Sequence, residues 1–254
     1  SNLKFIEDER GNSVNFKYES VNVSIRDSVI HFGDLSRSIS GDAQNLAVFL
    51  SPTDTKTAEG ETRYKFDLTS TDSNFVYEAK IVEKIDIRAV GIADDKGAEI
   101  GKLEIRTPLG ETSMSGTLSD WAAPKYELVI TSMVDLTQAS LTFATGTALR
   151  GVGNFKGHVS GQGESYRIEG SADSEAFRAD GVYLKAVNVA ATVEGTNNNY
   201  TANGTAIAEM LTFDVFRVDF LRLNGNVRGT GTDFRWVGEL QAIAAKTPDL
   251  SLGG

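Results

Sequence analysis

Histidine is the side chain that most readily exchanges protons near neutral pH, and this 254-residue chain has two, His31 and His158. Neither has a partner at the spacing of a metal site, and both stand in alternating patterns typical of strands, where we expect them to face solvent or a rim. A catalytic triad would need serine and aspartate partners from distant parts of the chain. The histidines therefore predict neither a metal centre nor a catalytic site.

Other candidate motifs also fail on spacing. Residues 97–102 resemble a phosphate-binding loop, but the glycine spacing is wrong and Leu103 stands where that loop needs serine or threonine. The glycines of residues 151–157 are not followed by a predicted helix, as a dinucleotide site requires. Asp94 and Asp95 lack the pattern of a calcium loop. We predict no enzyme activity, no cofactor and no catalytic residue.

The composition limits the kinds of partner and of site that the chain can have. The net charge is −10 with a pI of about 4.8 and no basic cluster, which argues against nucleic acid. The chain has no cysteine, so disulfides and thiolate metal sites are excluded. No apolar run approaches the ~18 residues of a membrane-spanning helix. The chain opens without methionine, and we expect a processed chain or a piece of a longer one.

Most of the chain is predicted to form strands. Apolar and polar residues alternate along most of the chain, which predicts an all-β protein. The exception is residues 134–144, where apolar residues are spaced three and four apart after Asp135, a suitable N-cap; this predicts one short helix. We expect one continuous segment over residues 1–254, with irregular strands over 1–133, the helix at 134–144 and repeats over 151–245.

A repeat of 34 residues runs through the last part of the chain, residues 151–245. Residues 157–170, 190–204 and 225–238 share a glycine, valine and aromatic pattern, in which Gly161, Gly195 and Gly229 correspond. Tyr166, Tyr200 and Phe234 also correspond. We expect three strands in each unit. In the first unit these are residues 151–161, 166–174 and 177–186, and the third runs on into residues 187–195, the first strand of the next unit. Glycine at a fixed strand position indicates a bend, so the units are expected to curve the sheet alike.

Nearly every predicted strand has one apolar and one polar face. An apolar face must be covered. A second layer would make these residues an ordinary core, whereas a curled sheet would leave a trough for a ligand with acyl chains. The residues alone leave both interpretations open.

The chain resembles the TamB and AsmA-like family of bacterial envelope proteins, and the order of the motifs carries the resemblance more than any single one. The motifs are residues 20–34, 40–46, 116–118 with 126–128, 134–136, Gly157-x-Val159-x-Gly161 and 179–184. The resemblance implies an elongated, curled, taco-like antiparallel β-sheet groove built from repeated strands. It also implies a periplasmic lipid-transfer protein that carries phospholipids between inner and outer membranes, anchored to the inner membrane through a segment absent from this chain. Assistance to the outer-membrane assembly machinery is a further implied role.

On this hypothesis the apolar face contacts acyl chains. The residues expected to line the groove are Leu128, Ile130, Tyr166, Ile168, Val182, Leu184, Val189, Val193, Val218, Phe220, Leu223, Val227, Phe234 and Trp236. The alternative is a structural or adhesive cell-surface module of β-repeats with a dry core, which predicts no bound lipid.

Overall fold

The computed structural model describes residues 21–34, 38–77, 80–121, 123–143, 148–231, 233–247 and 250–253. Almost all of them are in strands, and the single helix of these residues is α1 (Leu136–Phe143). The first half holds β1 (Val23–Asp34), β2 (Ile39–Lys56), β3 (Thr62–Tyr77), β4 (Lys80–Ala93), β5 (Gly97–Thr107), β6 (Gly110–Ser119) and β7 (Lys125–Asp135). The second half holds β8 (Val152–Gln162), β9 (Ser165–Ala179), β10 (Val182–Thr196), β11 (Asn199–Phe213), β12 (Phe216–Thr230), β13 (Asp233–Thr247) and β14 (Leu250–Gly253).

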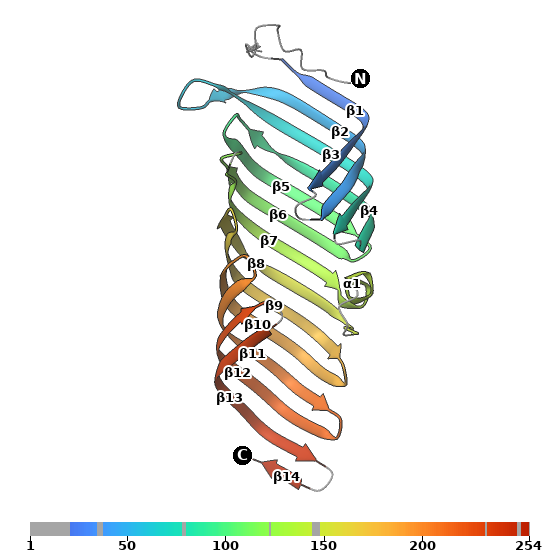
Figure 1. The fold of residues 1–254 in the computed structure, drawn as a ribbon, viewed down its shortest axis with the longest axis vertical. Coiled ribbons are helices and arrows are strands. Elements are labelled where there is room, and N and C mark those ends of the chain that lie inside the picture. Colours follow the sequence, from blue (N-terminus) through green and yellow to red (C-terminus); the bar gives the residue numbers. More distant parts are fainter. Residues whose placement is uncertain are drawn as a thin grey trace.

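The strands form one sheet in chain order from β1 to β14, and each pairs antiparallel with its sequence neighbours. The two end strands, β1 and β14, lie at opposite ends of an elongated molecule (Figure 1). The predicted all-β class, the antiparallel repeated strands and the single short helix are confirmed. Predicted strand positions before residue 21 lie outside the described residues.

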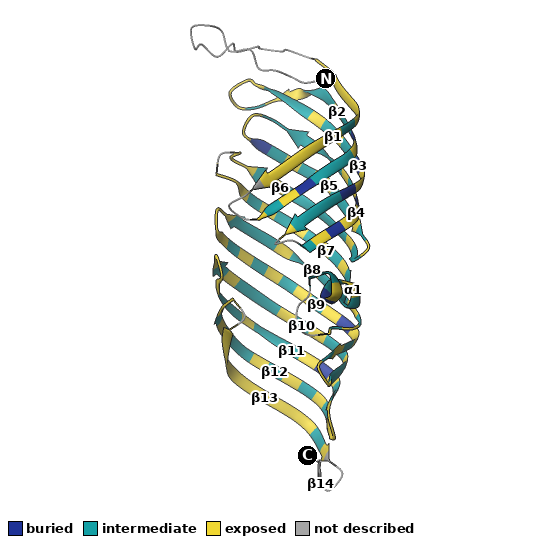
Figure 2. Cartoon of the chain, turned by 45° about the vertical axis from the view of Figure 1, so that its right-hand side comes forward, coloured by how far each residue is buried: buried dark blue, intermediate teal, exposed yellow. Residues whose placement is uncertain are grey.

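The sheet is a single layer. Among the described residues, the buried apolar side chains are Leu46, Val82, Ile85 and Ala208. The whole chain exposes 17399 Å², whereas a compact protein of 27.3 kDa exposes about 10,900 Å². Half-buried and exposed residues alternate along the strands from β7 to β12 (Figure 2), as expected when one face is more sheltered than the other.

The 34-residue repeat is a β-hairpin of two 15-residue strands. β9 and β10 form one unit, β11 and β12 the next, and β13 begins another. The prediction of three strands in each unit was wrong. The expected gap between residues 174 and 177 lies inside β9, and the expected junction at residue 186 lies inside β10. The expected strand 177–186 contains the turn between β9 and β10.

Those apparent breaks are bends within strands. Between β9 and β10 the register continues unbroken from Val182–Ala179 to Thr196–Ser165, and only the Glu175–Ala186 position lacks a pairing. Residues other than glycine have a positive φ inside six strands, which turns the chain locally: Asp27, Asn45, Asp72, Lys84, Ala186 and Phe220. Strands β1 to β4 bend visibly in Figure 1. A strand that bends while keeping its register loses apolar alternation, which is why the sequence suggested two strands.

The helix starts as predicted. The Asp135 Oδ1 accepts hydrogen bonds from the backbone N–H of Thr137 at 2.8 Å and of Gln138 at 3.0 Å, so it caps α1. The helix contacts β4 as well as β7 and β8. Because β5 pairs with β4 only from Asp86 onwards, the start of β4 extends past the short β5–β6 hairpin. The helix lies beside this extension and fills one edge of the curled sheet.

Candidate functional site: a continuous apolar face

Cα partners in an antiparallel sheet point their side chains to the same face, so the register defines rows that cross the molecule. One row takes one residue from each strand from β1 to β13, and every member is apolar or glycine. It runs through Val23, Leu50, Phe66, Gly91, Ile100, Gly116, Leu128, Val159, Ile168, Val193, Ala202, Val227 and Trp236. We call it the valine row.

A second row on the same face lies two residues along each strand, except on β5, where a register shift puts it three residues along, from Ile100 to Leu103. It too is free of polar side chains from β1 to β13, and it becomes glycine and alanine from β8 onwards. We call it the glycine row. Its members are Ile25, Val48, Leu68, Ala89, Leu103, Met114, Ile130, Gly157, Gly170, Ala191, Gly204, Gly225 and Gly238.

The opposite face is polar. Between Glu127 and Arg235 the row next to the valine row contains Ser160, Arg167, Glu194, Thr201 and Arg228. Arg167 pairs with Glu194 on the adjacent strand and with Glu169 at 3.2 Å. These hydrogen bonds and charges hold the pKa of Arg167 above its usual value. Lys185 contacts Glu209 at 2.9 Å near the bend of the strands. The charged groups are thus segregated from the apolar rows.

The apolar face is the concave side of the bent strands. Beside the bend in β9 to β13, Ser174 and Ala208 on the apolar face are 7% and 3% exposed. At the bend itself, Phe220 and Ile243 are 56% and 60% exposed. Burial on one side and exposure on the other show the direction of bending. The apolar rows therefore line the inside of the curl, and no second layer of the described residues covers them.

The structure brings most of the predicted groove residues onto this face. Leu128, Ile168, Val193, Val227 and Trp236 belong to the valine row, and Ile130 belongs to the glycine row. The flanking rows of the same face hold Tyr166, Phe234, Val189 and Leu223. Beyond the bend, Leu184 and Val218 are both Cα partners of Leu211, and Val182 is paired with Ala179 near the hairpin.

Phe220 lies apart from these rows. It has a φ of 53° and no Cα partner on either neighbouring strand, because it occupies the bend of β12. Alternation counted from Val218 places Phe220 on the apolar face, but the left-handed backbone interrupts the alternation at this residue. The sequence did not show this, since a positive φ is rare for phenylalanine.

The face also contains residues that sequence reasoning did not select. Val159, Ala202 and Gly116 belong to the valine row, as do its members on β1 to β5, and Phe155 lies beside the glycine row. Gly116 and Ala202 are too small to attract notice in a search for apolar anchors. Their register partners identify them, and only the assembled sheet supplies these.

Aromatic rings lie over glycines along one edge of the face. Across β7 to β13, Tyr126, Tyr166, Tyr200 and Phe234 alternate with Gly161, Gly195 and Gly229 as Cα partners. A methyl group on Gly195 would overlap the ring of Tyr166, and one on Gly229 would overlap that of Tyr200. We call this set the aromatic ladder. The 34-residue repeat was its sequence signal, but the pairing of ring and glycine was not visible.

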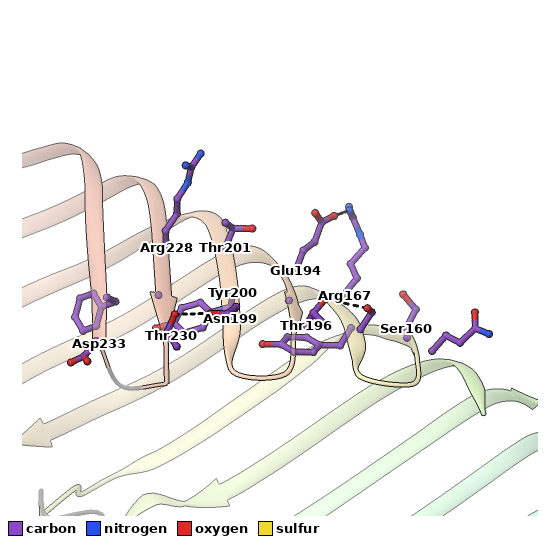
Figure 3. A pocket seen from close by; sticks show the side chains of 17 residues that line it. Ser160, Arg167, Glu194, Thr196, Asn199, Tyr200, Thr201, Arg228, Thr230 and Asp233 are labelled. Carbon is purple, nitrogen blue, oxygen red and sulfur yellow. Dashed lines mark hydrogen bonds and ion pairs between the residues drawn. The ribbon is translucent and has the colours of Figure 1, made fainter. Parts of the chain in front are cut away.

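A hollow of about 1010 Å³ lies along the hairpin turns beside the aromatic ladder (Figure 3). The lining includes Arg167, Glu194, Thr201 and Arg228, and in Figure 3 the last three stand clear of the strands. Polar residues of the turns complete it, with Thr230 donating to Asn199 Oδ1 at 2.7 Å. The aromatic ladder also lines this hollow, through Gly161, Tyr166, Gly195, Tyr200, Gly229 and Phe234. No residue of the valine row does, so the hollow lies at the rim, where the polar and apolar faces meet.

Polar contacts elsewhere are structural in character. The Asp42 carboxylate accepts a hydrogen bond from Asn74 at 3.0 Å and contacts the His31 ring. The bond from Asn74, followed by that from His31, lowers the pKa of Asp42. His158 is exposed on the polar face. The part of the chain that the structure describes contains no cluster of three or more metal-ligating side chains.

No family model, curated protein or solved structure gives a significant match to this chain. The described residues contain no helix with the length and apolar character needed to cross a bilayer. The geometry of the apolar face is therefore the basis for any functional inference.

Proposed function

We propose that this chain binds the acyl chains of phospholipids along its concave apolar face. It would serve as a segment of a lipid-transfer protein of the cell envelope, without enzyme activity. The observation that carries the proposal is the unbroken apolar character of the valine and glycine rows from β1 to β13. Each methylene group removed from water contributes about 0.8 kcal/mol, so an acyl chain on these rows is held without any specific contact.

The length of the face favours transfer over storage at one site. Neighbouring strands lie about 4.8 Å apart, so the rows from β1 to β13 extend over roughly 58 Å. One leaflet of a bilayer has a hydrocarbon depth of about 15 Å, half of the ~30 Å core. Several acyl chains therefore fit end to end, and none meets a polar row along the way.

The proposal includes a periplasmic location between inner and outer membranes. Its support is the motif order of the sequence, which resembles envelope proteins, together with the open groove that such a role needs. Assistance to outer-membrane assembly belongs to the same proposal. Head groups would lie at the open edge of the groove, where the polar rim residues are found.

Two neighbouring positions on opposite faces test lipid binding directly. A photoreactive benzophenone side chain at Val193 stands on the apolar face, and one at Thr192 stands on the polar face of the same strand. After irradiation in cells, we expect phospholipid attached to the protein labelled at Val193 and little at Thr192. Mass spectrometry of the purified adducts provides the measurement.

Equal labelling at the two positions, or no lipid at either, would count against the groove. The structural or adhesive alternative predicts this second result, since it requires a dry face. Native mass spectrometry of the unmodified protein offers an independent check through co-purified phospholipid.

A further inference from the structure

A row of cations crosses the strands beyond their bend, close to the hairpin turns. Its members, in the order of their pairing, are Arg150, Arg178, Tyr183, Thr212, Arg217 and Lys246. We call it the cationic row. It contains no carboxylate, although the chain as a whole has a net charge of −10. Positive charge is therefore concentrated at this rim, where it favours an anion.

The first two members of the cationic row lie directly opposite each other. The backbone N–H of Arg150 donates to the Arg178 carbonyl at 2.9 Å, and the N–H of Arg178 donates back at 3.1 Å. In a pair bonded in this way the Cα atoms lie about 5.5 Å apart. Like charges placed directly opposite each other destabilise a sheet. Neither arginine forms an ion pair with a carboxylate of the described residues, so their repulsion is uncompensated.

A hollow of about 520 Å³ lies at these two arginines, and we call it the arginine hollow. Tyr183 and Thr212 bring hydroxyl groups to its lining, and Asp180 is the one carboxylate among the described residues that line it. The guanidinium carbon of Arg178 lies 5.0 Å from the centre of the Tyr183 ring, which restricts the direction of its N–H donors. Two guanidinium groups and one carboxylate leave one positive charge uncompensated, and a phosphodiester would neutralise it.

The arginine hollow continues round the hairpin turn to an apolar surface. Its lining includes Ala179 and Val182, which are Cα partners of each other. They lie on the opposite face from Arg178, since successive residues of a strand alternate. Leu184, two residues beyond Val182, lies on the same apolar side. A ligand with an anionic head and an apolar tail therefore meets a matching surface at each part.

We propose that the arginine hollow binds the phosphate of a phospholipid head group, while the acyl chains of the lipid lie on the adjoining apolar side. Guanidinium groups match phosphate oxygens with paired N–H donors, and the phosphate relieves the repulsion between the two arginines. The inference rests on the proposed lipid binding and adds its substrate class, which is a phosphodiester lipid rather than a neutral one. Arg217 and Lys246 continue the row along the rim on β12 and β13, and Arg217 also pairs with Asp219 at 2.8 Å.

Two lipids with the same acyl chains test the inference. Dioctanoyl phosphatidylglycerol has a phosphodiester head group, and dioctanoylglycerol has none. Titration calorimetry with Arg150→Gln and with Arg178→Gln should show affinity for the phospholipid reduced about tenfold or more, because each variant removes hydrogen bonds to a charged group. Affinity for the diacylglycerol should be unchanged. Arg222→Gln is the matched control, since it removes an exposed guanidinium of β12 outside the hollow and should alter neither affinity.

Thermal unfolding without lipid separates a ligand site from a structural role. Arg150→Gln removes the repulsion between the two guanidinium groups, so the variant should unfold at a temperature no lower than the wild type. A clearly lower temperature would show that Arg150 stabilises the fold, and it would overturn the assignment of this pair to a ligand.

The remaining outcomes distinguish the head-group site from the groove. If the wild type binds both lipids and the arginine variants change both affinities equally, or neither, the head-group site is refuted and acyl-chain binding stands. If the wild type binds neither lipid, the proposed function and this inference fail together. Inorganic phosphate identifies the source of the phosphate group: we expect it to bind far more weakly than the phospholipid, because it lacks the apolar contacts. Equal affinity for the two would assign the hollow to free phosphate and overturn the proposal.

Discussion

Aromatic residues and glycines alternate from one strand to the next along the aromatic ladder. Tyr166 lies over Gly195, and Tyr200 lies over Gly229, one hairpin further along. A glycine in a strand interior ordinarily weakens it, because no side chain packs there. Here the ring from the neighbouring strand occupies the space that a side chain would take, an arrangement that compensates for the missing contact. The pairing thus keeps the curl without losing apolar contact.

Adding one methyl group to the ladder should therefore be costly. Gly195→Ala places a Cβ against the Tyr166 ring and the backbone oxygen of Asn199, so we expect a loss of about 1–3 kcal/mol in unfolding free energy. Gly33→Ala is the control, since its nearest neighbours would lie 3.7 and 3.8 Å from the new Cβ. Urea denaturation followed by circular dichroism gives both values. A similar small effect in the two variants would contradict the role of the ring.

At the residue scale, the sequence predicted which side chains are apolar but not always which way they point. Alternation is a local property, so Tyr166, Ile168 and Val193 were assigned to the correct face. Phe220 lies apart from the rows because of a left-handed backbone conformation that its side chain gives no reason to expect. Ala202 was overlooked because its importance comes from its partners Val193 and Val227, which lie on other strands.

At the scale of elements, the helix and the hairpins differ in how well the sequence predicted them. The capping aspartate and the three-and-four spacing located α1 within two residues. The hairpin unit was divided into too many strands, because the bend at Glu175 and Ala186 interrupts the alternation as a turn would. The distinction requires the continuous register on both sides of the bend, which is a property of paired strands.

The cap of α1 can be tested at the same scale. Asp135→Ala removes the acceptor for the N–H groups of Thr137 and Gln138, and we expect a loss of about 1 kcal/mol. Asp135→Asn retains an oxygen acceptor and should recover most of that loss. Hydrogen exchange of residues 136–143 is the appropriate measurement, because the change is local. Unaltered exchange in the alanine variant would show that tertiary contacts alone hold the helix.

At the scale of the molecule, the single layer determines the shape. Fourteen strands spaced by ~4.8 Å extend over about 62 Å, and the strands themselves are up to 18 residues long. A compact chain of this length would have a radius of gyration of ~18 Å. Small-angle scattering of the chain in solution should give a clearly larger value. A radius near the compact one would contradict the open groove.

The order of the strands determines how the length of the sheet changes when a hairpin is gained or lost. Every strand pairs only with its sequence neighbours, and no connection crosses the sheet. Duplication or deletion of one 34-residue hairpin therefore leaves all other pairings intact and changes the span by about 9.6 Å. Strand orientation and face are both preserved, because two strands are added or removed together. The number of hairpins therefore sets the length of the sheet, and with it the length of the apolar rows.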